Sequence, residues 1–154
     1  MANSVCEVLV TESALQAPAR TSLGNASVEA GAIVDFSGVV RKLEAGREIE
    51  GIEYESHTTM AEYQMRLIAE SAVEKFQLKE VVLHHRIGFV RAGEASLFLR
   101  VGAPHRAAAF EASKWIVDEL KKRVPIWKKP AFGPSPTGTP ARAGRSPQMS
   151  ELEK

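Results

Sequence analysis

The sequence predicts an α+β domain over residues 1–131 and a flexible tail over residues 132–154. Two long segments have the spacing of half-buried helices, and five short segments have the pattern of strands. From Pro130 onward, five prolines alternate with small and polar residues, and a segment of this composition is expected to stay disordered. At 154 residues, the chain is long enough for one domain with a core and too short for two.

The first half of the domain is predicted to contain three strands and one helix. The strands cover residues 5–10, 32–41 and 52–56, with a loop over residues 16–25 and a polar turn over residues 42–48. The helix follows Thr59, which has the spacing of a capping box with Glu62. Its buried face is predicted from the apolar residues at helical spacing, which are Met60, Tyr63, Leu67, Ile68, Ala72 and Phe76.

The second half is predicted to contain a β-hairpin and a second helix. Residues 81–87 and 95–101 form the two strands, and residues 88–93 form the turn between them. Pro104 is placed in the first turn of the helix, where proline is tolerated, and Pro125 ends it. The buried stripe of this helix consists of Ala109, Ala112, Ile116 and Leu120.

Charge and cysteine content exclude several classes of function. The formal net charge of +1 gives no general attraction to nucleic acid or to an anionic membrane, so an anion site needs a local cluster. No apolar run approaches the roughly 20 residues that span a bilayer, and the first ten residues lack the pattern of a signal peptide. The single cysteine, Cys6, allows no intrachain disulfide and no cysteine-pair metal site. We therefore expect a cytoplasmic protein without a metal or another cofactor.

His84 and His85 are also weak candidates for a metal site. Adjacent residues of a strand point to opposite faces of the sheet, so the two imidazoles cannot easily share one ion.

Three basic clusters remain as candidate sites. Arg41 follows a predicted strand, and His105-Arg106 begins the second helix. Exposed N–H groups and the helix dipole favour a phosphate at such a position, although both side chains can equally be solvated first-turn residues. The third cluster surrounds Pro125 and consists of Lys121, Lys122, Arg123, Lys128 and Lys129.

The third cluster has two interpretations. Cations near a helix C-terminus each stabilise the helix by roughly 0.3–1 kcal/mol, and Asp118 and Glu119 can pair with them. Alternatively, a lysine amine placed among other cations beside Ile126 and Trp127 can act as a nucleophile or a proton carrier. Spacing alone does not decide between them.

Taken together, these segments resemble the large, catalytic subunit of molybdopterin synthase. The matching residues occur in the family's order over about residues 28–129, and the most specific piece is the His105-Arg106 helix start combined with a Lys-x-x-x-Pro-x-Trp-Lys ending at residues 121–128. The matching stretches are residues 31–41, 52–55, 60–62, 85–88, 93–94, 105–106, 109–112, 120–121 and 124–129.

The resemblance implies an α/β hammerhead-type fold and a homodimer within a heterotetramer. Each end of the dimer would bind a small ubiquitin-like partner whose C-terminal Gly-Gly tail carries a thiocarboxylate. Two sulfurs would be transferred to cyclic pyranopterin monophosphate, a pterin phosphate, which would form the dithiolene of molybdopterin. The lone Cys6 agrees with this scheme, because the sulfur arrives on another polypeptide.

The resemblance also implies roles for individual residues. Lys121 and Lys128 look like the catalytic lysines, and Lys121 is expected to be the essential one. Lys121 would protonate a leaving oxygen, orient the thiocarboxylate or form a transient amide with the partner's tail. The implied substrate-binding residues are Val39, Val40, Arg41, His105, Arg106, Lys121, Lys128, Lys129 and Pro130. Val39 and Val40 would contribute mainly backbone. The tail departs from the family pattern, because Pro130 stands where an acidic residue is usual and no tryptophan follows Trp127.

Helix geometry adds a further prediction. Arg106 and Lys121 are 15 positions apart on one predicted helix, or ~22 Å at ~1.5 Å per residue. We therefore expect a site at the dimer interface, in which His105 and Arg106 of one copy face Lys121 and Lys128 of the other. The competing hypothesis is a non-catalytic module that binds a phosphorylated metabolite or an acidic peptide tail. RNA binding is disfavoured by the balanced charge and the few aromatic residues.

Overall fold

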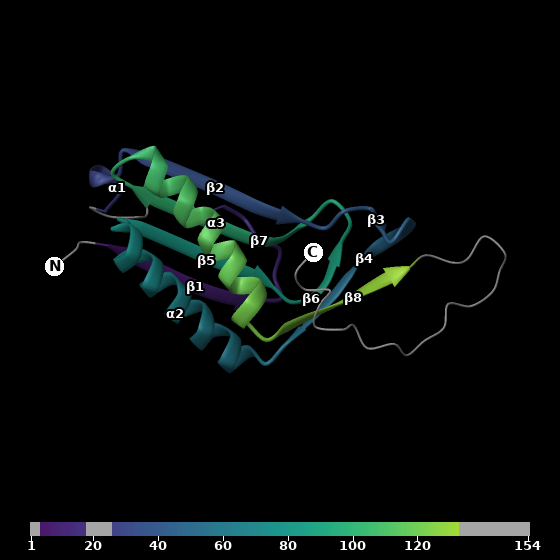
Figure 1. Cartoon of the computed structure of the whole chain (residues 1–154). Coiled ribbons are helices and arrows are strands. Elements are labelled where there is room, and N and C mark those ends of the chain that lie inside the picture. Colours follow the sequence, from purple (N-terminus) through teal and green to yellow (C-terminus); the bar gives the residue numbers. More distant parts are fainter. Residues whose placement is uncertain (1–3, 18–25, 133–154) are drawn as a thin grey trace, which may run out of the picture.

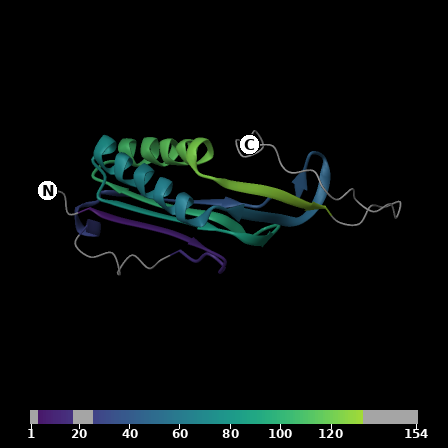
Figure 2. The same ribbon diagram turned by 90° about the horizontal axis from the view of Figure 1, so that it is seen from below.

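The computed structural model describes residues 4–17 and 26–132, and its main layer is a four-stranded sheet in the order β1-β5-β7-β2. The strands are β1 (Val5–Thr11), β5 (Glu80–Arg86), β7 (Ala95–Ala103) and β2 (Ala32–Val39). β1 runs parallel to β5, whereas β5–β7 and β7–β2 are antiparallel. Two long helices, α2 (Thr58–Phe76) and α3 (Arg106–Arg123), lie side by side on one face of this sheet (Figures 1 and 2).

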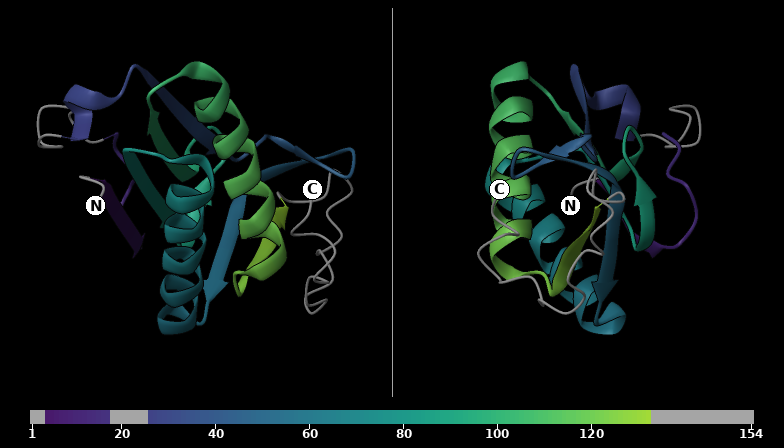
Figure 3. Two further views of the ribbon diagram at one scale, coloured as in Figure 1. Left: turned by 60° about the vertical axis from the view of Figure 1, so that its left-hand side comes forward. Right: turned by 90° about the vertical axis from the view of Figure 1, so that its right-hand side faces the viewer.

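A smaller set of strands extends from one end of the main sheet (Figure 1). It consists of β3 (Leu43–Glu44), β4 (Arg47–Ser56), β6 (Gly88–Arg91) and β8 (Ile126–Phe132). β4 is central, because β3, β6 and β8 all pair with it in antiparallel register. β8 leaves the C-terminal end of α3 and runs along β4 (Figure 3). The remaining element is the short helix α1 (Ala26–Glu29).

The core lies between the main sheet and the two helices. Large side chains of β5 and β7, such as Leu83 and Leu99, meet Met65 and Ile68 of α2 and Ile116 of α3, and all five are fully buried. The helices also contribute small residues, which let them approach the sheet and each other closely. These are Ala61, Ala69, Ala72, Ala109 and Ala112, all fully buried. The α+β class predicted from the sequence is therefore confirmed.

The start of α2 differs from the sequence prediction. His57 is the N-cap, and its Nδ1 accepts a hydrogen bond from the Met60 backbone N–H at 3.3 Å. The predicted capping box of Thr59 with Glu62 is wrong, because the Glu62 carboxylate instead accepts a bond from the Val10 backbone N–H at 3.4 Å. Glu62 therefore makes a tertiary contact with β1, and the local cap of α2 is His57.

The buried face of α2 is rotated from the predicted one. Ile68 and Ala72 are buried as expected, but Met60 and Tyr63 are exposed. Ala61, Met65 and Ala69 are buried instead. A broad apolar pattern leaves more than one candidate face, and contact with the sheet selects among them. For α3, the predicted stripe from Ala109 to Leu120 is buried as expected.

The β5–β7 pairing is confirmed, although the connection is more than a turn. Residues 88–91 form β6, which crosses to pair with β4. Gly88 has φ +82°, a conformation that glycine adopts without strain, and this redirects the chain away from β5. Pro104 also lies outside the first turn, because α3 begins at Arg106 with His105 as its N-cap.

Pro130 lies within β8 and not in a disordered segment. β8 continues to Phe132 and, among the described strands, pairs only with β4. It is therefore an edge strand, where a proline is tolerated. The disorder expected at residues 130–132 is therefore wrong. Residues 133–154 of the predicted tail, and residues 18–25 of the predicted loop, lie outside the described residues. No helix in the described ranges is long and apolar enough to cross a membrane.

Candidate functional site

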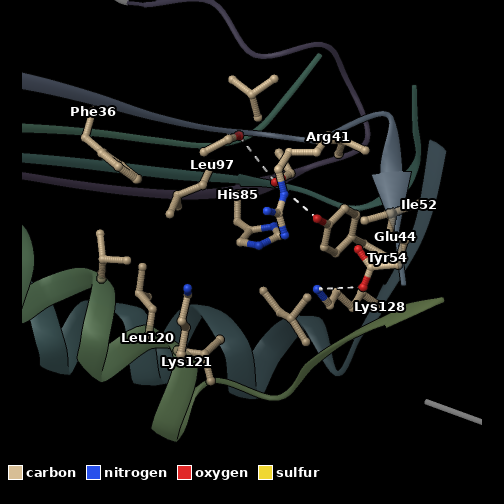
Figure 4. A pocket seen from close by; sticks show the side chains of 17 residues that line it. Phe36, Arg41, Glu44, Ile52, Tyr54, His85, Leu97, Leu120, Lys121 and Lys128 are labelled. Atoms are coloured by element: carbon tan, nitrogen blue, oxygen red, sulfur yellow. Dashed lines mark hydrogen bonds and ion pairs between the residues drawn. The ribbon is translucent and has the colours of Figure 1, made fainter. Parts of the chain in front are cut away.

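A cavity of about 240 Å³ lies where the C-terminal end of α3 faces the junction between the two sets of strands (Figure 4). Its walls come from β2, β3, β4, β5, β7, α3, β8 and the segment after β2. Much of the lining is apolar, including Phe36, Ile52, Leu97, Leu120 and Ile126. Many segments that are distant in sequence meet here, so the cavity is a product of the tertiary fold.

Three cations from separate segments line this cavity. Arg41 follows β2, Lys121 lies in the last turn of α3, and Lys128 is on β8. α3 ends at Arg123, and residues 124–125 turn the chain into β8, so the two lysines approach the cavity from different elements. Figure 4 shows both amines directed into the space between α3 and the strands. Arg41, Lys121 and Lys128 therefore line one cavity within a single chain.

The alternation of β8 separates Lys128 from its neighbour. Ile126 and Lys128 line the cavity, whereas Trp127 and Lys129 are exposed. Pro130 lies further along the strand and does not line the cavity. Val39 and Val40 do line it, beside Arg41. The substrate-binding roles expected of Lys129 and Pro130 remain predictions without support from this cavity.

His105 and Arg106 lie at the opposite end of α3 and do not line the cavity. Both are exposed, and the His105 side chain makes no capping hydrogen bond. α3 is continuous from Arg106 to Arg123, as the distance argument assumed. A site shared between two copies of the chain remains a prediction.

The cations at the end of α3 divide into two kinds. Lys122 and Arg123 lie 3.6 and 3.4 Å from the Glu119 carboxylate, and Asp118 is paired with Lys114 at 2.8 Å. These pairs fit the simple helix-stabilising interpretation. Within the described residues, no carboxylate forms an ion pair with Lys121, which lines the cavity beside Val117 and Leu120.

His85 is a wall residue that the sequence analysis dismissed together with His84. The two side chains do point to opposite faces, because His84 pairs with Glu7 at 2.6 Å while His85 lines the cavity. Nδ1 of His85 lies 2.8 Å from the Arg86 carbonyl oxygen, which only accepts, so Nδ1 carries the proton. Burial lowers the pKa of His85 to about 4, so the imidazole is neutral near pH 7 and its Nε2 is a hydrogen-bond acceptor.

Tyr54 and Glu44 are two further wall residues that sequence reasoning missed. The Tyr54 hydroxyl donates a hydrogen bond to Ser96 Oγ at 3.3 Å, and its ring packs edge-on against His85 with centroids 5.3 Å apart. Burial raises the pKa of Tyr54, so this hydroxyl stays protonated. Glu44 Oε1 lies 3.9 Å from Lys128 Nζ. The alternation of residues 52–56 was a usable signal for Tyr54, whereas no local pattern marked Glu44.

The lining therefore combines three cations, one carboxylate and several uncharged polar groups within a partly apolar cleft. Such a lining suits an extended, anionic chain end or a small phosphorylated molecule. The described residues contain no cluster of three or more histidine, cysteine or carboxylate side chains that could hold a metal ion.

Comparisons with known proteins agree with this arrangement. The family model of the MoaE protein matches residues 10–123, a range that includes Arg41, His85 and Lys121 and stops before Lys128. A molybdopterin synthase catalytic subunit from Pyrococcus abyssi is 44% identical over 103 residues, which is 67% of this chain and 70% of that protein. The protein of the same name from Homo sapiens is 39% identical over 107 residues, which is 70% of this chain and 57% of that protein.

Solved structures show the same fold. Molybdopterin synthase from Staphylococcus aureus superposes with a TM-score of 0.69 at 26% identity, covering 88% of this chain and 95% of that one. A complex of subunits 1 and 2 of the molybdopterin-converting factor from Helicobacter pylori has a TM-score of 0.61 at 20% identity, covering 84% and 90%. The second likeness is a likeness of fold alone.

Proposed function

The chain belongs to the MoaE protein family, and from this premise we propose that its cavity is the sulfur-transfer site of a molybdopterin synthase. In this proposal, a small ubiquitin-like partner inserts a C-terminal Gly-Gly thiocarboxylate, and the sulfur passes to cyclic pyranopterin monophosphate. The observation that carries the proposal is the convergence of Lys121, Lys128 and Arg41 on one cleft.

The cleft has the features that such a reaction needs. Glycines without side chains let an extended chain end enter a narrow space, and the apolar walls exclude water from the acyl-sulfur group. Arg41 and Lys128 supply positive charge for the anionic groups of the two reactants. Lys121 lies at the rim, where its amine can contact the acyl-sulfur group of an inserted tail.

His105 and Arg106 enter the proposal through a second copy of the chain. Their exposure at the N-terminal end of α3 leaves them available to a neighbouring copy, and the length of α3 keeps them from their own cavity. In this proposal the partner that supplies the thiocarboxylated tail makes the assembly heteromeric.

The decisive variant is Lys121→Arg. It keeps the positive charge but removes an easily deprotonated amine. We expect molybdopterin formation from thiocarboxylated partner and precursor to fall by about 100-fold or more, in the range of general acid–base contributions. The matched control is Lys122→Arg, on the same helix turn but paired with Glu119 outside the cavity, and it should retain full activity.

The same pair of variants separates an enzyme from a binding module. A non-catalytic module needs the charge of the cavity but not an amine, so Lys121→Arg would bind partner and precursor as well as the native protein does. Full molybdopterin formation by Lys121→Arg would reject the catalytic role proposed for Lys121.

A further inference from the structure

Glu44 is an acidic side chain inside a cavity whose other charged groups are cations. Its side chain is only 23% exposed, and the Lys128 side chain beside it is 13% exposed. Their charged atoms, Glu44 Oε1 and Lys128 Nζ, are 3.9 Å apart, and Figure 4 shows the pair against the strand side of the cavity, facing Lys121 across it. The Lys42–Glu48 pair of the same hairpin is far more open, with side chains 71% and 70% exposed.

The backbone holds Glu44 in a defined place. β3 pairs with β4 through Glu44 and Arg47, and the two residues between them, Ala45 and Gly46, have φ values of +52° and +79°. Consecutive residues with positive φ are typical of a tight type I′ hairpin turn. Glu44 is therefore carried on a short hairpin and not on a free loop.

The charges of the lining make Glu44 unusual for an anion site. Arg41, Lys121 and Lys128 are positive, His85 is neutral near pH 7, and Glu44 is negative. A carboxylate in this position reduces the attraction of the cavity for an incoming anion. It also orients a long, flexible lysine side chain that would otherwise sample many rotamers.

We propose that Glu44 is a positioning residue, which holds the Lys128 amine on the strand side of the empty cavity and releases it to the carboxylate-type end of an inserted peptide tail. This inference rests on the proposed function. Lys128 then exchanges one carboxylate partner for another, so its ammonium group is paired both before and after the tail enters. Glu44 thereby weakens tail binding and improves the placement of the amine.

Two variants separate these effects. Glu44→Gln removes the repulsion and the ion pair, so we expect a synthetic peptide with a free Gly-Gly carboxylate to bind about three- to tenfold more tightly, while the kcat of molybdopterin formation falls several-fold. Glu44→Asp keeps the charge but shortens the side chain by one methylene. We expect it to lower kcat while peptide affinity stays near the native value.

The controls use the same hairpin and the same peptide. Glu48→Gln removes one negative charge of the exposed Lys42–Glu48 pair, outside the cavity, and should change neither peptide affinity nor kcat. The peptide with a C-terminal amide should bind Glu44→Gln and the native protein equally, because it lacks the anionic end. A misfolded variant would lose affinity for both peptides, whereas the proposal requires a gain for one of them.

The outcomes also distinguish this inference from the proposed function. Equal affinity of the native protein and Glu44→Gln for the carboxylate peptide, or an unchanged kcat in Glu44→Gln, overturns the role of Glu44. A native protein that forms no molybdopterin with its thiocarboxylated partner overturns the proposed function, and the peptide comparison still reports whether Glu44 opposes an anionic end.

Discussion

The two ends of α3 both carry cations, and the C-terminal end lines the cavity described above, whereas His105 and Arg106 do not line it. At the N-terminal end, His105 and Arg106 stand beside exposed N–H groups, where the helix dipole favours an anion. At the C-terminal end, Lys121 stands where the dipole favours the cation itself. The cavity lies at the second end, where residues 124–125 lead from α3 into β8, and β8 pairs with β4 beside it. The charges and the helix dipole at each end of α3 thus identify candidate residues. The packing of distant strands against one end decides which of them share a site.

The largest expected effect comes from combining variants at the two ends. Lys121→Ala and Arg106→Ala should each lower molybdopterin formation by about 100-fold or more if both groups contact the reactants. If each site uses Lys121 of one copy and Arg106 of the other, a mixed dimer of the two variants contains one intact site.

Random mixing of equal amounts of the two variants should then restore about a quarter of the native activity, since half of the dimers are mixed and one of their two sites is intact. The measurement is activity after co-refolding or co-expression. No recovery above the single variants would show that the two ends do not contribute to a common site.

The next comparison is within β8. Lys128→Ala removes a cation that lines the cavity, and we expect kcat/KM to fall by about 10- to 100-fold, as for the loss of a hydrogen bond to a charged group. Lys129→Ala removes the next cation along the strand, which is exposed outside the cavity, and its kcat/KM should stay within about twofold of the native value. An equal fall in kcat/KM in the two variants would support a substrate-binding role for Lys129.

The smallest expected effect is on stability in acid. It tests the protonation state of His85, which lines the cavity at the C-terminal end of α3. The pKa of His85 is about 4 in the fold and about 6.5 in an unfolded chain, so protonation favours unfolding. The stabilising contribution is complete above pH 6.5 and is lost as the pH falls toward 4. We expect the free energy of unfolding to drop by about 1–2 kcal/mol more in the native protein than in His85→Gln over this range.

Urea denaturation at several pH values measures this difference. Parallel pH dependence of the native protein and His85→Gln would show that His85 protonates freely in the fold. In that case the fold would not lower the pKa of His85 below its unfolded value.

Particular elements show how far sequence reasoning extended. The apolar stripe of α3 and the pairing of residues 81–87 with 95–101 were predicted, because both depend on local periodicity. The predicted capping box of α2 was wrong, because Glu62 accepts a hydrogen bond from the backbone N–H of Val10, which is 52 positions away. β6 was mistaken for a turn, because its pairing partner β4 lies in another part of the chain.

Some residues of the candidate site were likewise found from the sequence, and others only from the structure. Arg41, Lys121 and Lys128 were recognised as cations in suggestive surroundings, and the resemblance to a known family supplied their expected roles. Glu44 carried no local signal, and the strand patterns around Tyr54 and His85 did not show that these residues share a site with the cations. Each lies on a different strand, and their proximity depends on β3, β4 and β5 meeting beside the end of α3.

By itself, the sequence determined the α+β class, the apolar face of α3, the position where that helix ends and the cations that follow it, because each of these depends on residues within a few positions of one another. Only the tertiary structure decided that Lys121 and Lys128 face one cavity while Lys129 does not, and that a carboxylate and a neutral imidazole complete its wall. A charge acquires its chemical environment from whatever the fold packs around it, and those neighbours come from strands that are dozens of residues apart.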